Sequence, residues 1–469
     1  MVHEFSQDHT SNEIAHAIAA TEPDVVGLSC YVWNVRALTA ACARVKQLRP
    51  WARIVLGGPE VGPVAESVMR AHSAVDVIVR SEGELPFAEL VSRWMTGDPI
   101  DEVAGITWRD GEAIRKTGDA PILSDLNLLP SPHLTLRTPL SATTDCRLSA
   151  TADCTSSATA DCARDLAGRV VCIETQRGCV FRCSFCFYNK DLSIRNRRFD
   201  LERVKRELRH ALAQDADEIY LMDPIFNLHA ERAKEICRFI AAHNAKRIGI
   251  HAEIWAEFMD DELARLMREA NVQFLEIGLQ STDEAALQTV ERRLKLQRFL
   301  DGVAHVKRHG LNWELQLIFG LPGETRASFR RSLNFAVSLD PTELAVYPLM
   351  VLPGTELWRK ASEVQLAFDP DPPYIVRSHF SMDEADVAYG HRVVRALQDL
   401  GDSRALRLLA RERGLTYTDV IDAWIAWEDE HPGLESTGYR VKQFLLEFCG
   451  RRQIKADFYS GFASWEFAG

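Results

Sequence analysis

The chain has 469 residues, a length that predicts two or three domains. Its net charge of −12 argues against a nucleic-acid partner, because phosphate contacts need a basic surface. No apolar run reaches the roughly 18 residues that a membrane span needs, and Met1 to Asp8 does not read as a signal peptide. Eleven cysteines without an export signal indicate free thiols and a metal site in a reducing cytoplasm.

Residues 1–122 alternate short apolar runs with helix-like segments. The strand-like runs are 25–30, 53–57 and 75–79, and the helical patterns are 38–48 and 87–94. This alternation predicts a doubly wound, Rossmann-type parallel sheet. Such sheets bind ligands at the carboxyl ends of their strands, where the turns Gly57-Gly58 and Glu82-Gly83-Glu84 fall.

Residues 123–169 have the composition of a linker. Prolines are frequent up to Pro139, and a tandem octapeptide repeat then places Cys146, Cys154 and Cys162 at even spacing. Small polar residues of this kind cannot build a core, so we interpret the repeat as a disordered insertion. The three cysteines leave a second metal cluster as the alternative.

The pattern Cys179-x-x-x-Cys183-x-x-Cys186 follows a strand-like run at 170–174. Thiolates suit iron–sulfur clusters and zinc, and three of them would leave one iron of a four-iron cluster open. The alternatives are a zinc knuckle or three unrelated core cysteines. A zinc knuckle usually needs a fourth Cys or His nearby, and none follows closely.

Residues 170–365 read as six βα units, short of the eight in a full barrel. The fold class we predict is therefore α/β: a partial (β/α)6 TIM-like barrel, preceded by a truncated doubly wound sheet. Polar residues and glycine turns cluster toward the carboxyl ends of the barrel strands, where parallel barrels carry their sites. They are Tyr220, Asp223, His251, Glu253, Glu276, Gln280, Ser281, Gly320 and Gly323.

From residue 366 the pattern changes to helical runs after a Pro-rich turn. We expect residues 366–469 to form a helical domain that caps the open side of the barrel. Trp424, Trp427, Phe444 and Phe448 recur at helical spacing, which indicates core positions rather than cofactor contacts.

The cysteine loop and the βα units after it resemble the radical SAM superfamily. The resemblance implies a [4Fe-4S] cluster on Cys179, Cys183 and Cys186, with S-adenosylmethionine on the open iron. It also implies cofactor contacts from Phe185, Glu276, Gln280, Ser281, Gly320 and Gly323. Tyr220, Asp223, His251 and Glu253 remain candidates for substrate binding or proton transfer. Arg195, Arg197 and Arg198 could pair with the carboxylate of S-adenosylmethionine or with an anionic substrate.

Residues 29–34, 57–60 and 81–84 resemble the cobalamin (B12)-binding domain found in one branch of that superfamily. Two features depart from it. The first strand of the domain is missing, since Val2 to Phe5 reads as the second strand, and no Asp-x-His-x-x-Gly motif supplies a lower axial ligand. Cobalamin binding and a vestigial scaffold therefore both remain open.

The resemblance implies an enzyme that cleaves S-adenosylmethionine reductively and uses the 5′-deoxyadenosyl radical to remove hydrogen from a small-molecule, natural-product substrate. With cobalamin, the outcome would be C-methylation. Without it, the outcome would be dehydration or epimerisation of a polyol or aminoglycoside sugar. An electron donor such as flavodoxin or ferredoxin is implied. The non-enzyme alternative is an iron–sulfur sensor or scaffold.

Overall fold

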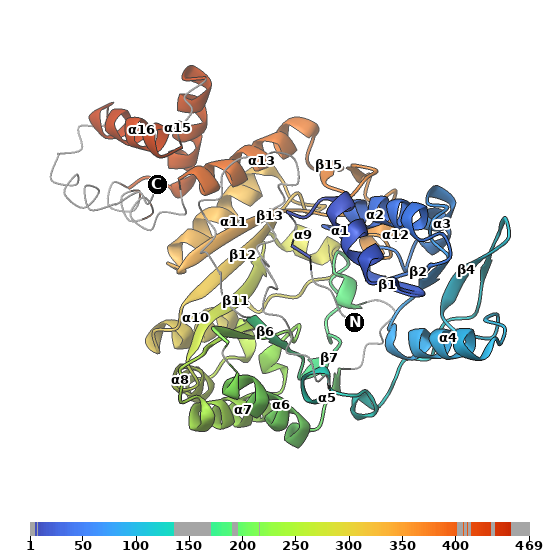
Figure 1. The fold of residues 1–469 in the computed structure, drawn as a ribbon. Helices are drawn as coiled ribbons and strands as arrows, with labels where there is room; N and C mark the ends of the chain where they lie inside the picture. Colours follow the sequence, from blue (N-terminus) through green and yellow to red (C-terminus); the bar gives the residue numbers. More distant parts are fainter. Residues whose placement is uncertain are drawn as a thin grey trace.

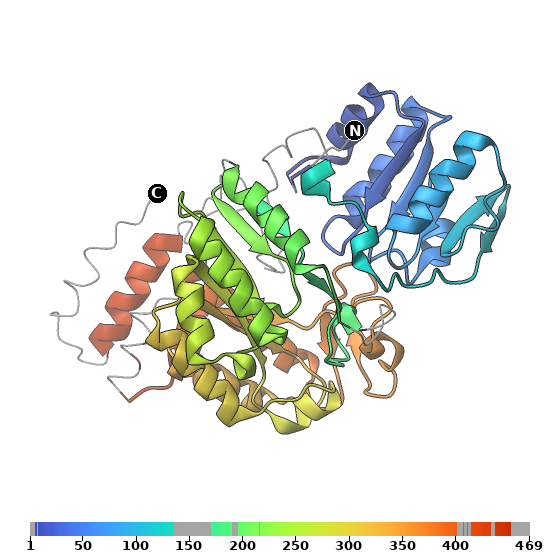
Figure 2. The same ribbon diagram turned by 90° about the horizontal axis from the view of Figure 1, so that it is seen from below.

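Two α/β units lie side by side in the computed structural model, a small sheet domain and a larger open barrel (Figures 1 and 2). The structure describes residues 5–6, 8–135, 170–189, 196–214, 216–400, 407, 410, 414–432 and 437–451. The octapeptide repeat with Cys146, Cys154 and Cys162, and residues Val2 to Glu4 of the expected first segment, lie outside this part of the chain.

The N-terminal sheet has the order β1-β2-β3-β4-β5. Strands β1 (Val25–Ser29), β2 (Arg53–Gly57) and β3 (Val77–Val79) run parallel, as the alternation predicted. One face packs against α1 (Ser11–Ala20), α2 (Val35–Leu48) and α3 (Ala65–Ala71), and the other face packs against α4 (Glu84–Thr96). The sheet is therefore doubly wound.

The last two strands of this sheet were not predicted. Strands β4 (Ile106–Asp110) and β5 (Ala113–Lys116) form an antiparallel hairpin whose turn contains Gly111 with a positive φ. The dipeptide Asp110-Gly111 between two alternating runs is a strong hairpin signal, so the sequence held enough information to find it. After the hairpin, residues 117–131 lead toward the barrel, and a single helical turn, α5 (Pro132–Thr135), follows them.

The barrel sheet has six parallel strands in the order β13-β12-β11-β10-β9-β6. The strands are β6 (Val170–Ile173), β9 (Glu218–Leu221), β10 (Gly249–Ile254), β11 (Val272–Gln280), β12 (Trp313–Phe319) and β13 (Glu343–Pro348). Within the described residues β6 and β13 are the two unpaired edges, so the barrel is open, as six units predicted. A short ribbon, β7 (Gln176–Arg177) with β8 (Arg197–Arg198), flanks the cysteine loop.

The outer helices follow the barrel strands, as the predicted βα units require. They are α6 (Leu201–Ala213), α7 (Ala230–His243), α8 (Asp261–Glu269), α9 (Glu284–Thr289), α10 (Leu296–Arg308) and α11 (Arg326–Ser338). The short α9 is an addition that was not predicted. Their apolar faces and the outward side chains of the strands form one continuous core. Periodicity was a reliable guide here because each helix has only one buried face.

The C-terminal helices do not cap the open side of the barrel in the way we expected. Helix α13 (Glu384–Asp399) packs on the outer face, where Gly390 meets the ring of the outward-facing Phe319. Helix α15 (Tyr417–Glu430) packs against α11 and α13, and α16 (Thr437–Arg451) joins them (Figure 1). The four aromatic residues of this region, Trp424, Trp427, Phe444 and Phe448, are all buried, which confirms them as core.

The segment between β13 and α13 connects the two α/β units instead. It contains α12 (Glu356–Arg359) and the ribbon of β14 (Ala367–Phe368) with β15 (Val376–Ser378). Tyr374 on this segment donates a 2.5 Å hydrogen bond to the buried Glu60 of the sheet domain, and the amide of Leu357 donates to the carbonyl of Ser184. No helix in the described part of the chain is long and apolar enough to span a membrane.

Replacing Gly302 by Ala tests how tightly the barrel core is packed. A Cβ at this position of α10 would lie 1.9 Å from the carbonyl oxygen of Ala256, which is backbone and cannot swing aside. We expect Gly302→Ala to destabilise the chain by about 1–3 kcal/mol, despite the better helix propensity of alanine. Thermal unfolding measures the loss. Gly118→Ala, where a Cβ meets nothing, is the control; equal melting temperatures for both variants would contradict this packing.

Candidate cofactor and substrate site

The loop that carries Cys179, Cys183 and Cys186 follows the first barrel strand, and its backbone is fixed before the first cysteine. Both oxygens of the buried Asp223 accept hydrogen bonds, from the amides of Thr175 and Gln176 and from the hydroxyl of Thr175. These bonds join the end of β6 to the end of β9. The loop therefore starts from a rigid point.

The same loop is held again between its cysteines. The amide of Ser184 donates to the carbonyl of Val290, and the ring of Phe181 stacks on Trp255 with centroids 3.9 Å apart. The guanidinium of Arg292 lies over the ring of Trp255, with its Cζ 4.5 Å from the ring centroid. It also donates a hydrogen bond to the carbonyl of Gly278. Several elements of the barrel thus fix the loop.

The three thiols lie on one short loop, close enough to affect one another's pKa. Each of Cys179 and Cys186 feels the charge of Cys183, and Cys186 also feels that of Cys179. Burial raises the pKa of the Cys186 thiol to about 12, so a positively charged group must replace its proton for it to act as a ligand. Among the described residues, no three His, Cys, Asp or Glu side chains, these thiols included, are already placed to hold a metal ion.

A cation lies beside the thiols. Nη1 of Arg292 is 3.7 Å from Sγ of Cys183, and the side chain is buried. Thiolate-bound clusters carry negative charge, and a neighbouring guanidinium offsets part of it. With three thiols on one short loop, a fixed backbone and this cation, the loop offers the ligand chemistry of a [4Fe-4S] cluster.

The inward side of the barrel strands, called the lumen here, is less buried than the outward side. On β10 to β13 the outward side chains are fully buried under the helices, whereas the inward ones are partly exposed. Glu253, Glu276 and Glu314 are register partners on three neighbouring strands, so three carboxylates stand side by side in this lumen. The lumen is polar and strongly acidic.

The side chain of His251 lies between two carboxylates on the neighbouring strands. Its Nε2 is 2.8 Å from Glu276 and its Nδ1 is 3.3 Å from Glu218. Burial alone would lower the pKa of His251, but the two carboxylates outweigh it and raise the pKa to about 9. The imidazole is therefore charged at neutral pH and bridges two strands.

The other carboxyls of the lumen are harder to ionise. Burial and the neighbouring Glu276 raise the pKa of Glu253 to about 8, although Arg292 and His251 oppose the shift. Burial raises the pKa of Glu314 to about 7, while Gln316 donates to both Glu314 and Glu276. A protonated Glu253 close to the thiols can donate a hydrogen bond or a proton at neutral pH.

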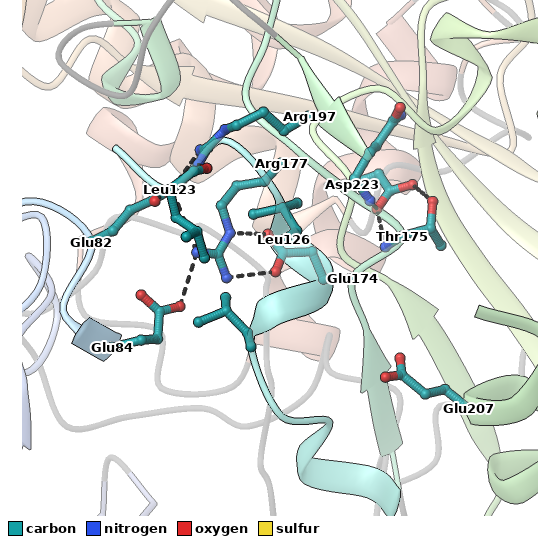
Figure 3. Close-up of polar contacts among 12 residues, drawn as sticks. Glu82, Glu84, Leu123, Leu126, Glu174, Thr175, Arg177, Arg197, Glu207 and Asp223 are labelled. Atoms are coloured by element: carbon teal, nitrogen blue, oxygen red, sulfur yellow. Dashed lines mark hydrogen bonds and ion pairs between the residues drawn. The ribbon is translucent and has the colours of Figure 1, made fainter. Parts of the chain in front are cut away.

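The carboxyl edge of the N-terminal sheet is turned toward the barrel. Glu60, in the turn after β2, bonds to Tyr374, and Glu82, in the turn after β3, pairs with Arg177 and Arg197 beside the cysteine loop (Figure 3). Tyr31, after β1, lies close enough to Tyr188 of the cysteine loop to affect its pKa. The ends of all three strands therefore face the cysteine loop and the segment around Tyr374.

Comparison with known proteins agrees with this division. Residues 173–336 match the radical SAM superfamily and residues 2–91 match the B12 binding domain. The chain therefore carries a radical SAM domain preceded by a B12-binding domain. Its structure aligns with the cobalamin-dependent radical SAM enzyme OxsB, with aqua-cobalamin and S-adenosylmethionine bound. The TM-score is 0.61 at 15% identity, over 96% of this chain and 69% of that chain.

Two curated relatives are similar in sequence. An uncharacterized methyltransferase, PH0819 of Pyrococcus horikoshii, is 26% identical over 76% of this chain and 73% of its own length. The cobalamin-dependent radical SAM methyltransferase TokK of Streptomyces tokunonensis is 28% identical over 78% of this chain. The alignment spans 53% of TokK, so about half of that protein has a counterpart here.

The radical SAM domain brings some of the predicted site residues together. Tyr220, His251, Glu253 and Glu276 line the lumen, and the ring of Tyr220 contacts His251 edge-on. Glu276 has partners, as its position in an apolar strand required. Gln280 ends β11 with a positive φ of 69°, and its Oε1 is buried without a partner.

Other predicted residues have different surroundings. Asp223 is enclosed by the backbone that it holds, so it is a positioning residue for the cysteine loop. Ser281 is fully buried, and its hydroxyl bonds to Glu324 and Ser332. Gly320 and Gly323 both have positive φ, and Glu324 accepts from the amide of Gly320. Phe185 packs against the core beside the cysteines.

Arg197 differs from its expected role. We expected it to face S-adenosylmethionine or substrate, but it is buried against Glu82; Arg195 lies outside the described residues. Sequence reasoning also gave no role to Arg292, Trp255, Glu314 or Arg177. Glu314 and Gln316 alternate on one strand, a pattern that could have identified them as lumen residues. Nothing local to Arg292 signals its contact with a distant cysteine.

The charge bridge of His251 should make stability depend on pH. The pKa of His251 in the folded protein lies above its unfolded value of about 6.5. The bridge therefore contributes its full stabilisation of the fold below about pH 6.5, and this stabilisation is lost as the pH rises through about 9. We expect His251→Gln to remove about 2 kcal/mol of stability at pH 7 and little at pH 10. Urea unfolding of both proteins at pH 6, 7, 8, 9 and 10 measures this. A difference that stays constant over the series would contradict the assignment.

Proposed function

We propose that this chain is a cobalamin-dependent radical SAM methyltransferase that adds a methyl group to a carbon of a small molecule. The observation that carries the proposal is that the carboxyl edge of the B12-binding domain faces the cysteine loop. When bound, the cluster and S-adenosylmethionine would supply the radical that removes hydrogen from carbon, and cobalamin would supply the methyl group. The relatives named as methyltransferases support the same reaction.

Residues at the carboxyl edge of the B12-binding domain fit a flat, largely apolar group. Tyr31 and Trp33 stack with their planes 9° apart and centroids 4.6 Å apart at the end of β1, and Trp33 remains 47% exposed. An exposed stacked pair of aromatic rings is a surface that a large ring can cover. The next turn approaches closely, because Gly58 has a φ of 105° and a Cβ there would lie 2.4 Å from the carbonyl oxygen of Cys30.

The lumen would bind the substrate. Its wall offers carboxylates, an amide and the hydroxyls of Tyr220 and Tyr347, which suits a substrate rich in hydroxyl or amino groups. Glu253 is close to the thiols and holds a proton at neutral pH, so it would position or protonate the substrate near the reacting carbon. A flavodoxin or ferredoxin would deliver the electron.

Retention of cobalamin and transfer of a labelled methyl group test the proposal. Anaerobically reconstituted protein should keep corrin absorbance after desalting with hydroxocobalamin. With S-adenosylmethionine deuterated at its methyl group, it should form products heavier by a deuterated methyl, detected by mass spectrometry against a panel of amino-sugar and β-lactam precursors. Retention without any methylated product, but with dehydrated products, would favour the radical dehydration of a polyol or aminoglycoside sugar.

Trp33→Ala tests whether the stacked rings at the end of β1 bind cobalamin. It removes the exposed half of the stack without touching the core or the cysteines, so its folding and iron content should equal those of the wild type. We expect it to retain cobalamin at least about fivefold less well, in line with the loss of an aromatic contact of about 1 kcal/mol. Equal retention by Trp33→Ala and wild type would remove this surface from the proposal.

A further inference from the structure

A group of buried charges joins the B12-binding domain to the cysteine loop. Glu82, in the turn after β3, accepts hydrogen bonds from the two terminal nitrogens of Arg197, Nη2 at 2.5 Å and Nη1 at 2.9 Å (Figure 3). Both side chains are almost fully buried, and Arg197 also donates to the carbonyl of Leu123. Two guanidiniums outweigh the effect of burial and lower the pKa of Glu82, so the carboxylate is ionised.

Arg177 links these charges to the first cysteine. It lies two residues before Cys179, and its Nη1 is 3.4 Å from Glu82 and 2.9 Å from Glu84. Its Nε and Nη2 both donate to Glu174 at 2.9 Å. The side chain thus spans from the end of the first barrel strand to the turn of the other domain, as Figure 3 shows.

The backbone between these contacts has little freedom. Asp223 holds Thr175 and Gln176 from the barrel side, and the carboxylates of Glu82 and Glu84 hold Arg177 from the other side. Ribbon β7–β8 pairs Arg177 with Arg197 directly, so one carboxylate holds both of its strands. Any shift of Glu82 would move the peptide that leads into Cys179.

We propose that Glu82 is a positioning residue for the cluster: through Arg177 and Arg197, the carboxyl edge of the B12-binding domain sets the place of Cys179. The alternative is that these ion pairs only dock the two domains. The cluster part of the proposal does not depend on cobalamin. If cobalamin binds at the same edge, reciprocal linkage follows, and each cofactor changes the affinity for the other by the same factor.

The chain offers matched controls for this proposal. Tyr374 and Glu60 form a buried contact between the same two domains that does not touch residues 174–179. Arg36 and Asp371 form an exposed pair across the same boundary, with side chains 63% and 78% exposed, and exposed pairs contribute little. Glu84 bonds to the same arginine as Glu82 but is 42% exposed.

The test uses the full chain with its cluster reconstituted and without cobalamin, so failure of the cobalamin proposal does not affect it. Iron loss to a ferrous chelator is timed, and the EPR spectrum of the reduced cluster is recorded with and without S-adenosylmethionine. We expect Glu82→Gln to lose iron about tenfold faster and to change the spectrum, because an unpaired buried guanidinium remains. Glu82→Asp, which keeps the charge, should recover part of the loss, and Glu84→Gln should have a smaller effect.

Tyr374→Phe decides between positioning and docking. If it leaves iron loss and the EPR spectrum at wild-type values while Glu82→Gln changes both, the positioning role stands. If both variants accelerate iron loss equally, Glu82 acts only by docking the domains, and the proposal fails. Wild-type behaviour of Glu82→Gln would also overturn it. Should Glu82→Gln fail to fold, Arg197→Lys, which keeps the charge but loses the paired contact, gives the same comparison.

Discussion

The position of three thiols depends on how one short backbone segment, residues 174–178, is held. A buried carboxylate fixes it from the barrel, and guanidinium–carboxylate pairs fix it from the neighbouring domain. A cluster with an open iron requires such rigidity, because its ligands must keep their geometry while a second molecule binds. The barrel, the sheet domain and the segment around Tyr374 all contribute to this one requirement.

Much of the fold followed from the sequence because its periodicities are simple. Each barrel helix, such as α6 or α7, has one apolar face and each strand is short and apolar, so the six βα units could be recognised. The β4–β5 hairpin was overlooked although Asp110-Gly111 marks its turn. The C-terminal helices were predicted as helices but misplaced, because periodicity shows that a face is buried without showing what buries it.

The candidate site was predictable only where residues act through local spacing. The three cysteines and the lumen residues on alternating strands fall in this class. Ser281, Asp223 and Arg197 were given direct roles, but each is engaged by a partner at least 40 residues away in the chain. Arg292 reaches Cys183 across 109 residues. Long-range pairs of this kind depend on the packing of the whole barrel, which no short window of sequence contains.

The central claim is that the cysteine loop holds a cluster that cleaves S-adenosylmethionine. The most direct measurement is the yield of 5′-deoxyadenosine from anaerobically reconstituted, reduced protein supplied with S-adenosylmethionine. The claim predicts product from the wild type and from Cys237→Ala, whose buried thiol is remote from the loop in sequence. It predicts none above background from Cys183→Ala. Equal yields from Cys183→Ala and wild type, or no product from a wild type that carries a full cluster, would contradict it.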